Sequence, residues 1–291
     1  MTVARRPEEL ERRPRVVAIG TFDGVHLGHE AVIRAAVEAG PSPTVVTFDP
    51  HPRTVLGNRV ELLATLERRL ELLGTVGAED ILVVEFTSDV AALSPEEFSA
   101  RYLRAIGAEV VVAGAGFHFG HRREGDLELL DRLGFETREV PLVDRVSSSA
   151  IRASAHEGDV RGAAQLLGRP LELDGTVVSG DQRGGTLGFP TANLRVDPEL
   201  LVPSYGIYAG AVGDRRAAVS IGVNPHYGGT ERRIEAYLLD WEGDLYGQRL
   251  VLELWRRLRS ERAFESEAQL VEQIVRDVEE TRAAEPPVIR N

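Results

Sequence analysis

The sequence predicts two domains of different class: an α/β domain with a parallel sheet, then a small antiparallel β-barrel closed by a helix. Three observations support this prediction. The chain has 291 residues, which is enough for two ordinary domains. In the first half, apolar strand-like runs alternate with helical patterns, as in a parallel sheet with crossover helices. In the second half, strand-like runs recur without long helices between them, as in an antiparallel sheet or barrel.

The first half contains five short apolar runs that predict buried strands. Helical patterns separate them, and Ser94, Pro95 and Glu97 form the capping box of one of these helices. The predicted strands are 15–20, 43–48, 81–86, 109–113 and 137–140, and the predicted helices are 27–38, 65–76, 95–106 and 126–133. Ligands of parallel sheets bind at the carboxyl ends of the strands. Three stretches directly follow strands and should therefore line that edge: GTFDGVHLGH, TFDPHP and AGAGFHFG.

The second half contains five strand-like runs that are separated by Gly, Pro and Asp. They are 171–180, 206–212, 217–223, 233–241 and 248–258. An amphipathic helix at 266–280 closes the chain, and its apolar residues on one face are Leu270, Val271, Ile274 and Val278. A short helical piece at 160–167 joins the halves. The predicted domains are 1–152 and 168–291, with a helical linker at 153–167.

Composition excludes several classes of protein. Hydrophobic residues make up 43% of the chain, which is ample for packed cores, and the net charge of −12 argues against a protein that grips nucleic acid. The absence of cysteine excludes disulfides and thiolate metal sites. A charged N-terminal stretch and the lack of a long apolar run predict a cytoplasmic protein that neither enters nor binds a membrane.

All 34 basic residues are arginines, an absence of lysine for which a genome-wide codon bias is the simplest cause. It excludes a Walker-type P-loop and the strand lysine of protein kinases, because both place a lysine on the phosphates. Any phosphate chemistry must therefore use backbone N–H groups, histidine, arginine and a metal ion.

His26 and His29 lie three residues apart in GTFDGVHLGH, where a predicted strand leads into a helix. Glycines allow close approach of a ligand, and the N–H groups and dipole of the helix attract anions. A phosphate site is the favoured interpretation. Histidines that serve packing are the second alternative, and a zinc site with His51, His118 or His121 as further ligands is the third.

The order of motifs along the chain resembles that of the bacterial bifunctional riboflavin kinase/FAD synthetases. The motifs cover nearly the whole sequence: GTFDGVHLGH, TFDPHP (47–52), ALSPEEF (92–98), FHFGHRREGD (117–126), VSSSAIR (146–152), GDVRGAAQLLGRP (158–170), TLGFPTANL (186–194), IEAYLLDWEGDLYG (234–247) and LRSERAFES (258–266). The resemblance implies a Rossmann-like nucleotidyltransferase domain of the HxGH type, followed by a barrel of the riboflavin kinase type. It also implies two reactions with ATP as co-substrate and Mg²⁺ as cofactor. Riboflavin is phosphorylated to FMN in the second domain, and FMN is adenylylated to FAD with release of pyrophosphate in the first.

For the first domain, the resemblance implies that His26 and His29 are catalytic and that Asp49 contacts the flavin. The residues that it implies for ATP binding there are Gly20, Phe22, Gly24, Ser147, Ser148 and Arg152.

For the second domain, the resemblance implies that Glu235, at an alternate position of a strand, is the base that activates the riboflavin hydroxyl. Thr191 and Asn193 are implied for ATP and Mg²⁺, since both offer hard oxygen ligands. The phosphate loop is implied to contribute Gly180, Arg183 and Gly184, and the flavin contacts are implied to include Arg259 and Glu261.

Three positions of the first domain depart from the family's pattern: Gly116, His118 and Ala150 stand where the family usually has polar or basic groups. Their loss from the adenylyltransferase domain keeps two alternatives open. One is a riboflavin kinase with an impaired adenylyltransferase domain, and the other is a flavin-binding protein without turnover. The sequence indicates small-molecule substrates and no nucleic-acid partner, and it does not show the oligomeric state.

Overall fold

A computed structural model describes residues 1–180, 188–223 and 232–289, and the chain divides into two compact units. The first, here the sheet unit, consists of Met1–Glu61 and Leu66–Ser147. The second, here the barrel unit, consists of Leu62–Thr65 and Ser148–Asn291. Where the functional domains begin and end stays a prediction, but the helices around the predicted linker belong to the barrel unit.

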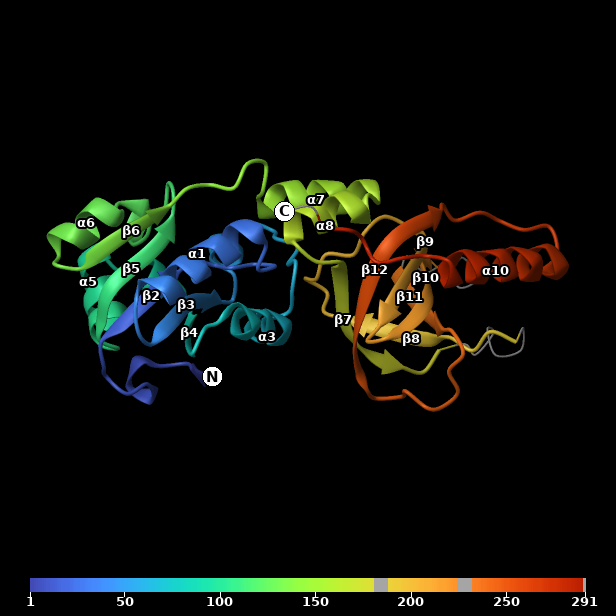
Figure 1. Cartoon of the computed structure of the whole chain (residues 1–291), viewed down its shortest axis with the longest axis horizontal. Coiled ribbons are helices and arrows are strands. Elements are labelled where there is room, and N and C mark those ends of the chain that lie inside the picture. The colour runs from blue at the N-terminus through green and yellow to red at the C-terminus, as the bar shows by residue number, and fades with distance from the viewer. Residues whose placement is uncertain (181–187, 224–231, 290–291) are drawn as a thin grey trace. The chain divides into compact units, whose positions relative to one another are not determined.

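The sheet unit contains a parallel six-stranded sheet with the order β1-β4-β3-β2-β5-β6 (Figure 1). Its strands are β1 (Thr2–Ala4), β2 (Arg15–Ile19), β3 (Pro43–Asp49), β4 (Asp80–Glu85), β5 (Ala108–Gly114) and β6 (Glu136–Val140). The five predicted strands are confirmed. β1 was not predicted, because three residues are too few to show a period, and it is held by pairing with β4 alone.

Helices cover both faces of this sheet. They are α1 (Leu27–Ala39), α2 (Pro52–Val55), α3 (Leu66–Val76), α4 (Ser88–Ala91), α5 (Pro95–Phe98) and α6 (Leu127–Arg132), with a π-helical segment η2 (Ser99–Arg104) and 3₁₀ turns η1 (Pro7–Glu9) and η3 (His121–Arg123). Ala18 packs with α1 and α3 in one core, whereas its neighbour Val17 packs with α5 and α6 in the other. Successive strand residues point to opposite faces, so both faces are apolar. The predicted capping box at Ser94 is present, but the helix continues past Phe98 in π geometry.

A buried ion pair fastens the amino edge of the sheet. Arg15 Nη1 at the start of β2 lies 2.5 Å from Asp80 Oδ2 of β4 and 2.9 Å from Thr44 Oγ1 of β3. Burial would raise the pKa of Asp80, but hydrogen bonds from Arg15 and Thr2 hold that pKa below its usual value. Three parallel strands are thereby joined at the edge opposite to their ligand-binding ends.

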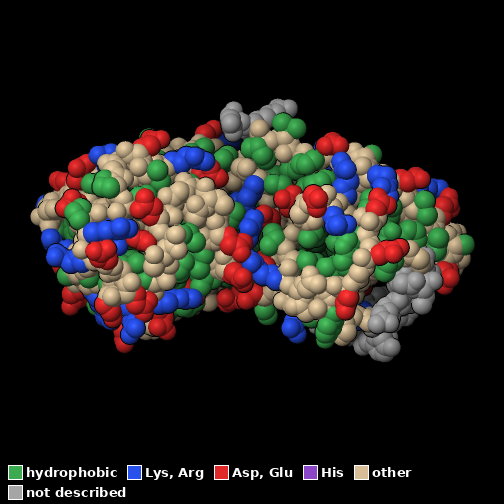
Figure 2. Space-filling view, turned by 60° about the horizontal axis from the view of Figure 1, so that its bottom comes forward, with side chains coloured by type: hydrophobic (Ala, Val, Ile, Leu, Met, Phe, Trp, Pro, Cys, Tyr) green, Lys and Arg blue, Asp and Glu red, His purple; other side chains and the backbone are tan. Residues whose placement is uncertain are grey.

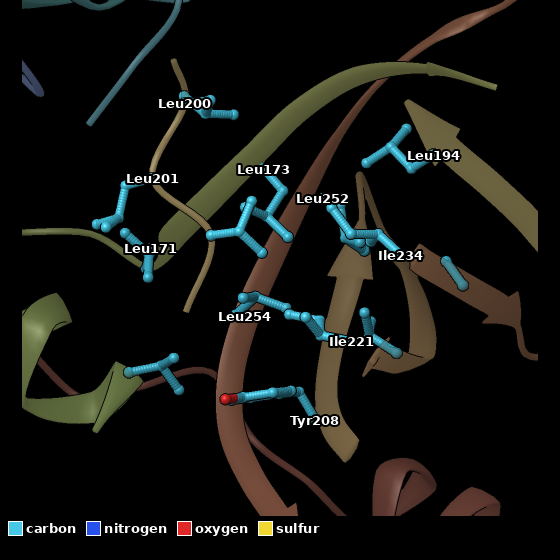
Figure 3. Packing of buried hydrophobic residues seen from close by; sticks show 14 of the residues in the cluster. Leu171, Leu173, Leu194, Leu200, Leu201, Tyr208, Ile221, Ile234, Leu252 and Leu254 are labelled. Atoms are coloured by element: carbon cyan, nitrogen blue, oxygen red, sulfur yellow. The ribbon is translucent and has the colours of Figure 1, made fainter. Parts of the chain in front are cut away.

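The barrel unit contains a closed antiparallel barrel with the order β10-β11-β8-β7-β12-β9. Its strands are β7 (Leu171–Val178), β8 (Ala192–Val196), β9 (Gly206–Val212), β10 (Arg215–Val223), β11 (Arg232–Leu238) and β12 (Arg249–Arg259). The five predicted strands are confirmed. β8 was not predicted, because it follows the turn signal of Gly188 and Pro190 and has only five residues. In Figure 3, Leu173, Leu252 and Ile221 converge on the barrel interior.

Two helices and one short segment extend the barrel core. α7 (Ser148–Glu157) and α8 (Val160–Leu167) contribute Ile151 and Leu167 to the same buried cluster as the barrel strands. Leu63 joins this cluster from the segment between α2 and α3. Leu62 N–H donates to the carbonyl oxygen of Glu199 at 2.7 Å. The chain therefore contributes Leu62–Thr65 to the barrel unit before it returns to the sheet unit at α3.

The closing helix α10 (Glu267–Arg282) packs on the barrel through polar residues. Its buried positions are Gln273, Asp277 and Thr281, whereas the predicted apolar face is only half-buried. Arg259 of β12 donates to both carboxylate oxygens of Asp277 at 2.7 to 3.1 Å, and Gln273 donates to Asp277 at 2.8 Å. The closing helix was predicted correctly, but the polar stripe that it buries could not be inferred from amphipathicity.

Candidate active sites

The strand order places a topological switch point between β2 and β5 of the sheet unit. Strand connections run in one direction from β2 to β4 and in the other from β5 to β6. Open α/β sheets bind ligands in the crevice at the carboxyl ends of such neighbouring strands. The GTFDGVHLGH turn follows β2 and AGAGFHFG follows β5, while TFDPHP ends the adjacent β3. The three predicted stretches therefore meet at this edge.

The turn after β2 has a strained backbone. Phe22 has φ 50°, Gly24 has φ 81° and Val25 has φ 40°. Positive φ is unfavourable for Phe and especially for β-branched Val. Both side chains are 1% exposed, and the Phe22 ring packs against Gly20, where an added Cβ would lie 3.1 Å from the ring. Packing thus holds a conformation that the local sequence alone would not favour.

The two histidines of this turn are stacked on each other. Their ring centroids lie 3.5 Å apart with an interplanar angle of 13°, and the edge of Phe22 meets the His29 ring at 5.3 Å. His26 caps α1, since its Nδ1 accepts the backbone N–H of His29 at 3.3 Å. Because Nδ1 accepts this hydrogen bond, a neutral His26 ring has its proton on Nε2, where it can donate to an anion. The first turn of α1 and the imidazoles together form an anion-binding geometry.

The zinc alternative gains no support from this geometry. Within the three described stretches of chain, no group of three or more His, Asp or Glu side chains is placed to hold a metal ion. His51 instead caps α2, with its Nδ1 accepting the N–H of Arg53 at 3.1 Å. His118 and His121 are exposed in the segment after β5.

The start of the SSSAIR segment lies against the histidine turn. A Cβ built on Gly28 would lie 3.3 Å from His26 Cε1 and 3.8 Å from Val146 Cγ1. Ser147, which follows Val146, is exposed and ends the sheet unit. Ser148 and Arg152 belong to α7 of the barrel unit, and their contact with the triphosphate stays a prediction.

The departures from the family pattern do not disturb packing in the sheet unit. Gly116 has φ 75°, and a Cβ added there would meet nothing within 4 Å. His118 is exposed, and Ala150 lies in α7. At the two exposed positions, Gly116 and His118, the missing groups are therefore surface groups, whereas Ala150 is half-buried.

Asp49, the predicted flavin contact, ends β3 and is held between two cations. Its carboxylate lies 3.4 Å from Arg5 Nη1 and 3.8 Å from Arg69 Nη2. Arg69 was not predicted as a site residue. The sequence does contain a signal for Arg69: it shares the inward stripe of its helix with Leu72 and Leu73, where a charged residue is unusual.

A second cluster of functional side chains forms on the outside of the barrel. Glu235 of β11 and Asn193 of β8 are direct cross-strand neighbours. Glu235 is half-buried and alternates with Ile234 and Ala236, which are buried in the barrel core. Thr191 Oγ1 donates to Glu235 Oε2 at 3.5 Å. The register of two strands therefore brings these three predicted residues together.

Gly180 completes this cluster, because a Cβ added there would overlap the side-chain amide of Asn193. Beside it, the Phe189 ring meets Tyr237 edge-on at 5.5 Å. This aromatic pair was not predicted, although Tyr237 is two residues from Glu235 and therefore shares its strand face. Arg183 and Gly184 lie outside the described residues.

The two predicted flavin contacts of the barrel unit have different surroundings. Arg259 is engaged by Asp277 and so holds α10, whereas the Glu261 carboxylate lies over Gly222, which has no room for a Cβ. Burial raises the pKa of Glu261, and the charge of Arg259 acts against this rise. A hollow of about 320 Å³ lies nearby, lined by Arg262, Ala263, Phe264, Glu265, Gln269, Glu272, Gln273 and Arg276. Arg262 stacks over the Phe264 ring at 4.9 Å.

On the face shown in Figure 2, basic side chains of the described residues are interspersed with acidic ones rather than clustered. Nucleic-acid binding depends on clustered basic side chains that displace counterions.

The fold and the two clusters define a two-domain enzyme of the nucleotide-dependent transferase class. A family model described as FAD synthetase matches residues 8–155, and one described as riboflavin kinase matches residues 167–284. A relative from Listeria monocytogenes is 38% identical over 92% of this chain and 92% of its own length, and one from Bacillus subtilis is 37% identical over 93% and 92%. Both are described as bifunctional riboflavin kinase/FMN adenylyltransferase. The chain belongs to the family of bifunctional riboflavin kinase/FMN adenylyltransferases, which confirms the resemblance predicted from the sequence.

A crystal structure from Streptococcus pneumoniae has the same fold. It is 31% identical, with a TM-score of 0.86, and the match covers 97% of this chain and 99% of that chain. That protein is described as a macrolide-efflux protein. In the present chain, none of the helices formed by the described residues combines the length and the apolarity needed to cross a membrane.

Proposed function

We propose that the barrel unit phosphorylates riboflavin to FMN and that the sheet unit adenylylates FMN to FAD, each with ATP. One observation carries this proposal: both side-chain clusters are assembled in a chain that matches bifunctional relatives over nearly their whole length. The two alternatives, an impaired adenylyltransferase domain and a flavin-binding protein without turnover, are not favoured by matches to both family models.

In the kinase reaction, Glu235 is the general base. Its carboxylate accepts the proton of the ribityl 5′-hydroxyl while that oxygen bonds to the γ-phosphorus of ATP and ADP leaves. The hydrogen bond from Thr191 to Glu235 Oε2 orients the carboxylate. The other oxygen then accepts the proton.

Mg²⁺ fits the same cluster. Thr191 and Asn193 offer a hydroxyl and an amide oxygen, which are hard ligands of the kind that Mg²⁺ prefers. Mg²⁺ usually keeps several waters and phosphate oxygens, so few protein ligands are needed. The ion would neutralise charge on the phosphates of ATP. Gly180, and the Arg183 and Gly184 that lie outside the described residues, are proposed to bind the same phosphates.

In the adenylylation reaction, a phosphate oxygen of FMN bonds to the α-phosphorus of ATP, and pyrophosphate leaves. Negative charge shifts onto the leaving group, so donors fixed in advance lower the barrier. His26 Nε2, His29 and the first N–H groups of α1 are the proposed donors. Gly20, Phe22 and Gly24 shape the turn that holds them.

For the remaining site residues, the proposed roles rest on membership of the same family. Ser147, Ser148 and Arg152 would bind the triphosphate of ATP, and Asp49 would contact the flavin of FMN. Arg259 and Glu261 would contact riboflavin. A cytoplasmic location stays a prediction.

A two-step assay on the wild-type protein tests the proposal. Riboflavin, ATP and Mg²⁺ are incubated with the protein, and the products are separated by chromatography over time. We expect FMN first and FAD afterwards, with both lost when EDTA removes Mg²⁺. FMN without FAD would reject the adenylyltransferase function, and the absence of FMN would reject the kinase function.

A further inference from the structure

Arg69 is a buried cation at the carboxyl edge of the parallel sheet. It is 3% exposed and lies on the inward stripe of α3 with Leu72 and Leu73. A guanidinium loses its hydration when it is buried, so it persists there only when protein groups replace the water. Burial lowers the pKa of Arg69, and the carboxylates of Asp23 and Asp49 oppose that shift. Its position therefore depends on specific partners.

Those partners belong to two different segments, the turn after β2 and the end of strand β3. Nη1 donates to the carbonyl oxygen of Thr21 at 3.1 Å, and Nη2 donates to the carbonyl oxygen of Phe48 at 2.9 Å. Thr21 belongs to the histidine turn after β2, and Phe48 belongs to TFDPHP at the end of β3. A guanidinium is planar and rigid, so its two terminal nitrogens hold the two carbonyls at a fixed separation.

The hydrogen bond from Arg69 to the Thr21 carbonyl holds the strained part of the histidine turn. Thr21 directly precedes Phe22, whose φ is 50°, and the Phe22 ring packs edge-on against His29 at 5.3 Å. Thr47 Oγ1 also donates to the Thr21 carbonyl, at 3.0 Å, which again ties the turn to β3. A displacement of Thr21 would also displace Phe22 and, through the contact of its ring with His29, the stacked histidines.

We propose that Arg69 is a positioning residue for FMN adenylylation: its guanidinium joins the histidine turn to the end of β3 and so sets where His26 and His29 stand. The inference rests on the adenylyltransferase function proposed above. Arg69 itself contacts no reacting atom in this account. Its effect is on the geometry of the donors, and displacements of about 1 Å in such groups cost on the order of 100-fold in rate.

Three substitutions of Arg69 separate positioning from ordinary core packing. Arg69→Met keeps the length of the side chain and removes both donors and the charge, and Arg69→Gln keeps one donor group without the charge. Arg69→Lys keeps the charge but replaces the planar guanidinium by a single ammonium, which cannot hold the two carbonyls at a fixed separation. Arg132→Met, in α6, is the control, because Arg132 is exposed and its ion pair with Glu128 spans 3.9 Å at the surface.

The readout is kcat and KM for conversion of FMN and ATP to FAD, with riboflavin kinase activity and thermal unfolding measured on the same samples. We expect R69M and R69Q to lower the adenylylation kcat about 100-fold while KM for FMN and for ATP changes less than about threefold. R69K should lower kcat about 10-fold. The kinase rate should be unchanged in every variant, and R132M should match the wild type within about twofold.

The outcomes test the positioning role of Arg69 separately from the proposed adenylyltransferase function. If the wild type makes no FAD from FMN, the proposed function itself fails. If the wild type is active and folded R69M keeps kcat within about threefold, or raises KM alone, the positioning role is overturned. If neither neutral variant accumulates as folded protein, R69K decides: a kcat about 10-fold lower at wild-type thermal stability supports the role, and an unchanged kcat overturns it.

Discussion

The two units place their functional side chains in opposite ways. In the sheet unit, His26 and His29 stand on a loop beyond the end of β2, in a turn with three left-handed residues. In the barrel unit, Glu235 and Asn193 stand within paired strands, on the outer face of a barrel whose interior is apolar. A loop can adopt many conformations, so contacts with other parts of the fold must fix the positions of its side chains. Paired strands fix the positions of neighbouring side chains through their register.

This difference explains the supports that each unit contains. The histidine turn is held by a buried Phe22, by the hydrogen bond between His26 and the His29 N–H, and by the bonds of Arg69. In the part of the chain that the structure describes, the Glu235 cluster is supported by the hydrogen bond from Thr191. Changes away from the reacting groups should therefore affect adenylylation more readily than phosphorylation.

The largest expected effect is in the barrel unit. Glu235→Gln removes the proton acceptor without changing the size of the side chain, and FMN formation should fall about 1000-fold. FAD formation from supplied FMN should stay at the wild-type rate. Initial rates by chromatography measure both reactions, and the exposed Glu199→Gln is the matched control. An unchanged rate of FMN formation would show that Glu235 is not the base.

The corresponding change in the sheet unit should be smaller, because His29 is one donor among several. His29→Ala should lower FAD formation from FMN about 100-fold and leave riboflavin phosphorylation unchanged. The same chromatographic assay measures it, and His156→Ala, an exposed histidine in α7, is the control. A loss of less than about threefold would favour histidines that serve packing over donors to phosphate.

Thr191→Val tests how much the Glu235 cluster depends on the hydrogen bond from Thr191. The substitution removes the hydroxyl that bonds Glu235 and would bind Mg²⁺, so kcat for FMN formation should fall about 10-fold and half-saturation should require more Mg²⁺. A Mg²⁺ titration at fixed ATP measures both effects. A lower kcat with the same Mg²⁺ dependence would assign Thr191 to orientation of Glu235 alone.

The smallest effect on activity should come from the opposite edge of the sheet. Asp80→Asn leaves Arg15 buried without its carboxylate, so the free energy of unfolding should fall by about 3 kcal/mol while both kcat values stay unchanged. Hydrogen bonds hold the pKa of Asp80 below its usual value against the raising effect of burial. Its stabilising contribution is therefore present above the usual Asp pKa and is lost as the pH falls through the lowered pKa.

Denaturant unfolding of wild type and Asp80→Asn from neutral to acid pH checks this prediction. The stability difference between the two proteins should shrink as the pH falls below about 4. A difference that does not depend on pH would contradict the proposed ionisation of Asp80.

Periodicity and turn signals were sufficient to predict most of the fold. The five longer strands of each unit and the closing helix follow from apolar runs and spacing. β1 and β8 were missed because three and five residues beside turn signals carry no clear period. The polar stripe of α10 was missed because amphipathicity identifies an apolar face, whereas Asp277 is buried by its pairing with Arg259.

The roles of the site residues stay predictions, and local motifs were sufficient to propose residues that lie close together in the barrel unit. Glu235, Asn193 and Thr191 were predicted, and the structure brings them together. Arg69 was not: its place on the apolar stripe of α3 is unusual for a charged residue, but its partners are two backbone carbonyls from separate segments, which leave no pattern in the sequence. The aromatic pair of Phe189 and Tyr237 was missed for the same reason, since it depends on how a turn lies over a strand.

The central claim is that two independent sites divide the two reactions, and mixing two inactive variants tests it most directly. Glu235→Gln and His29→Ala are each incubated with riboflavin, ATP and Mg²⁺, separately and then together, and FAD is quantified. The account predicts little FAD from Glu235→Gln, FMN with little FAD from His29→Ala, and FAD at close to the wild-type rate from the mixture. A mixture that makes no more FAD than its better member, while His29→Ala still makes FMN, would contradict the claim.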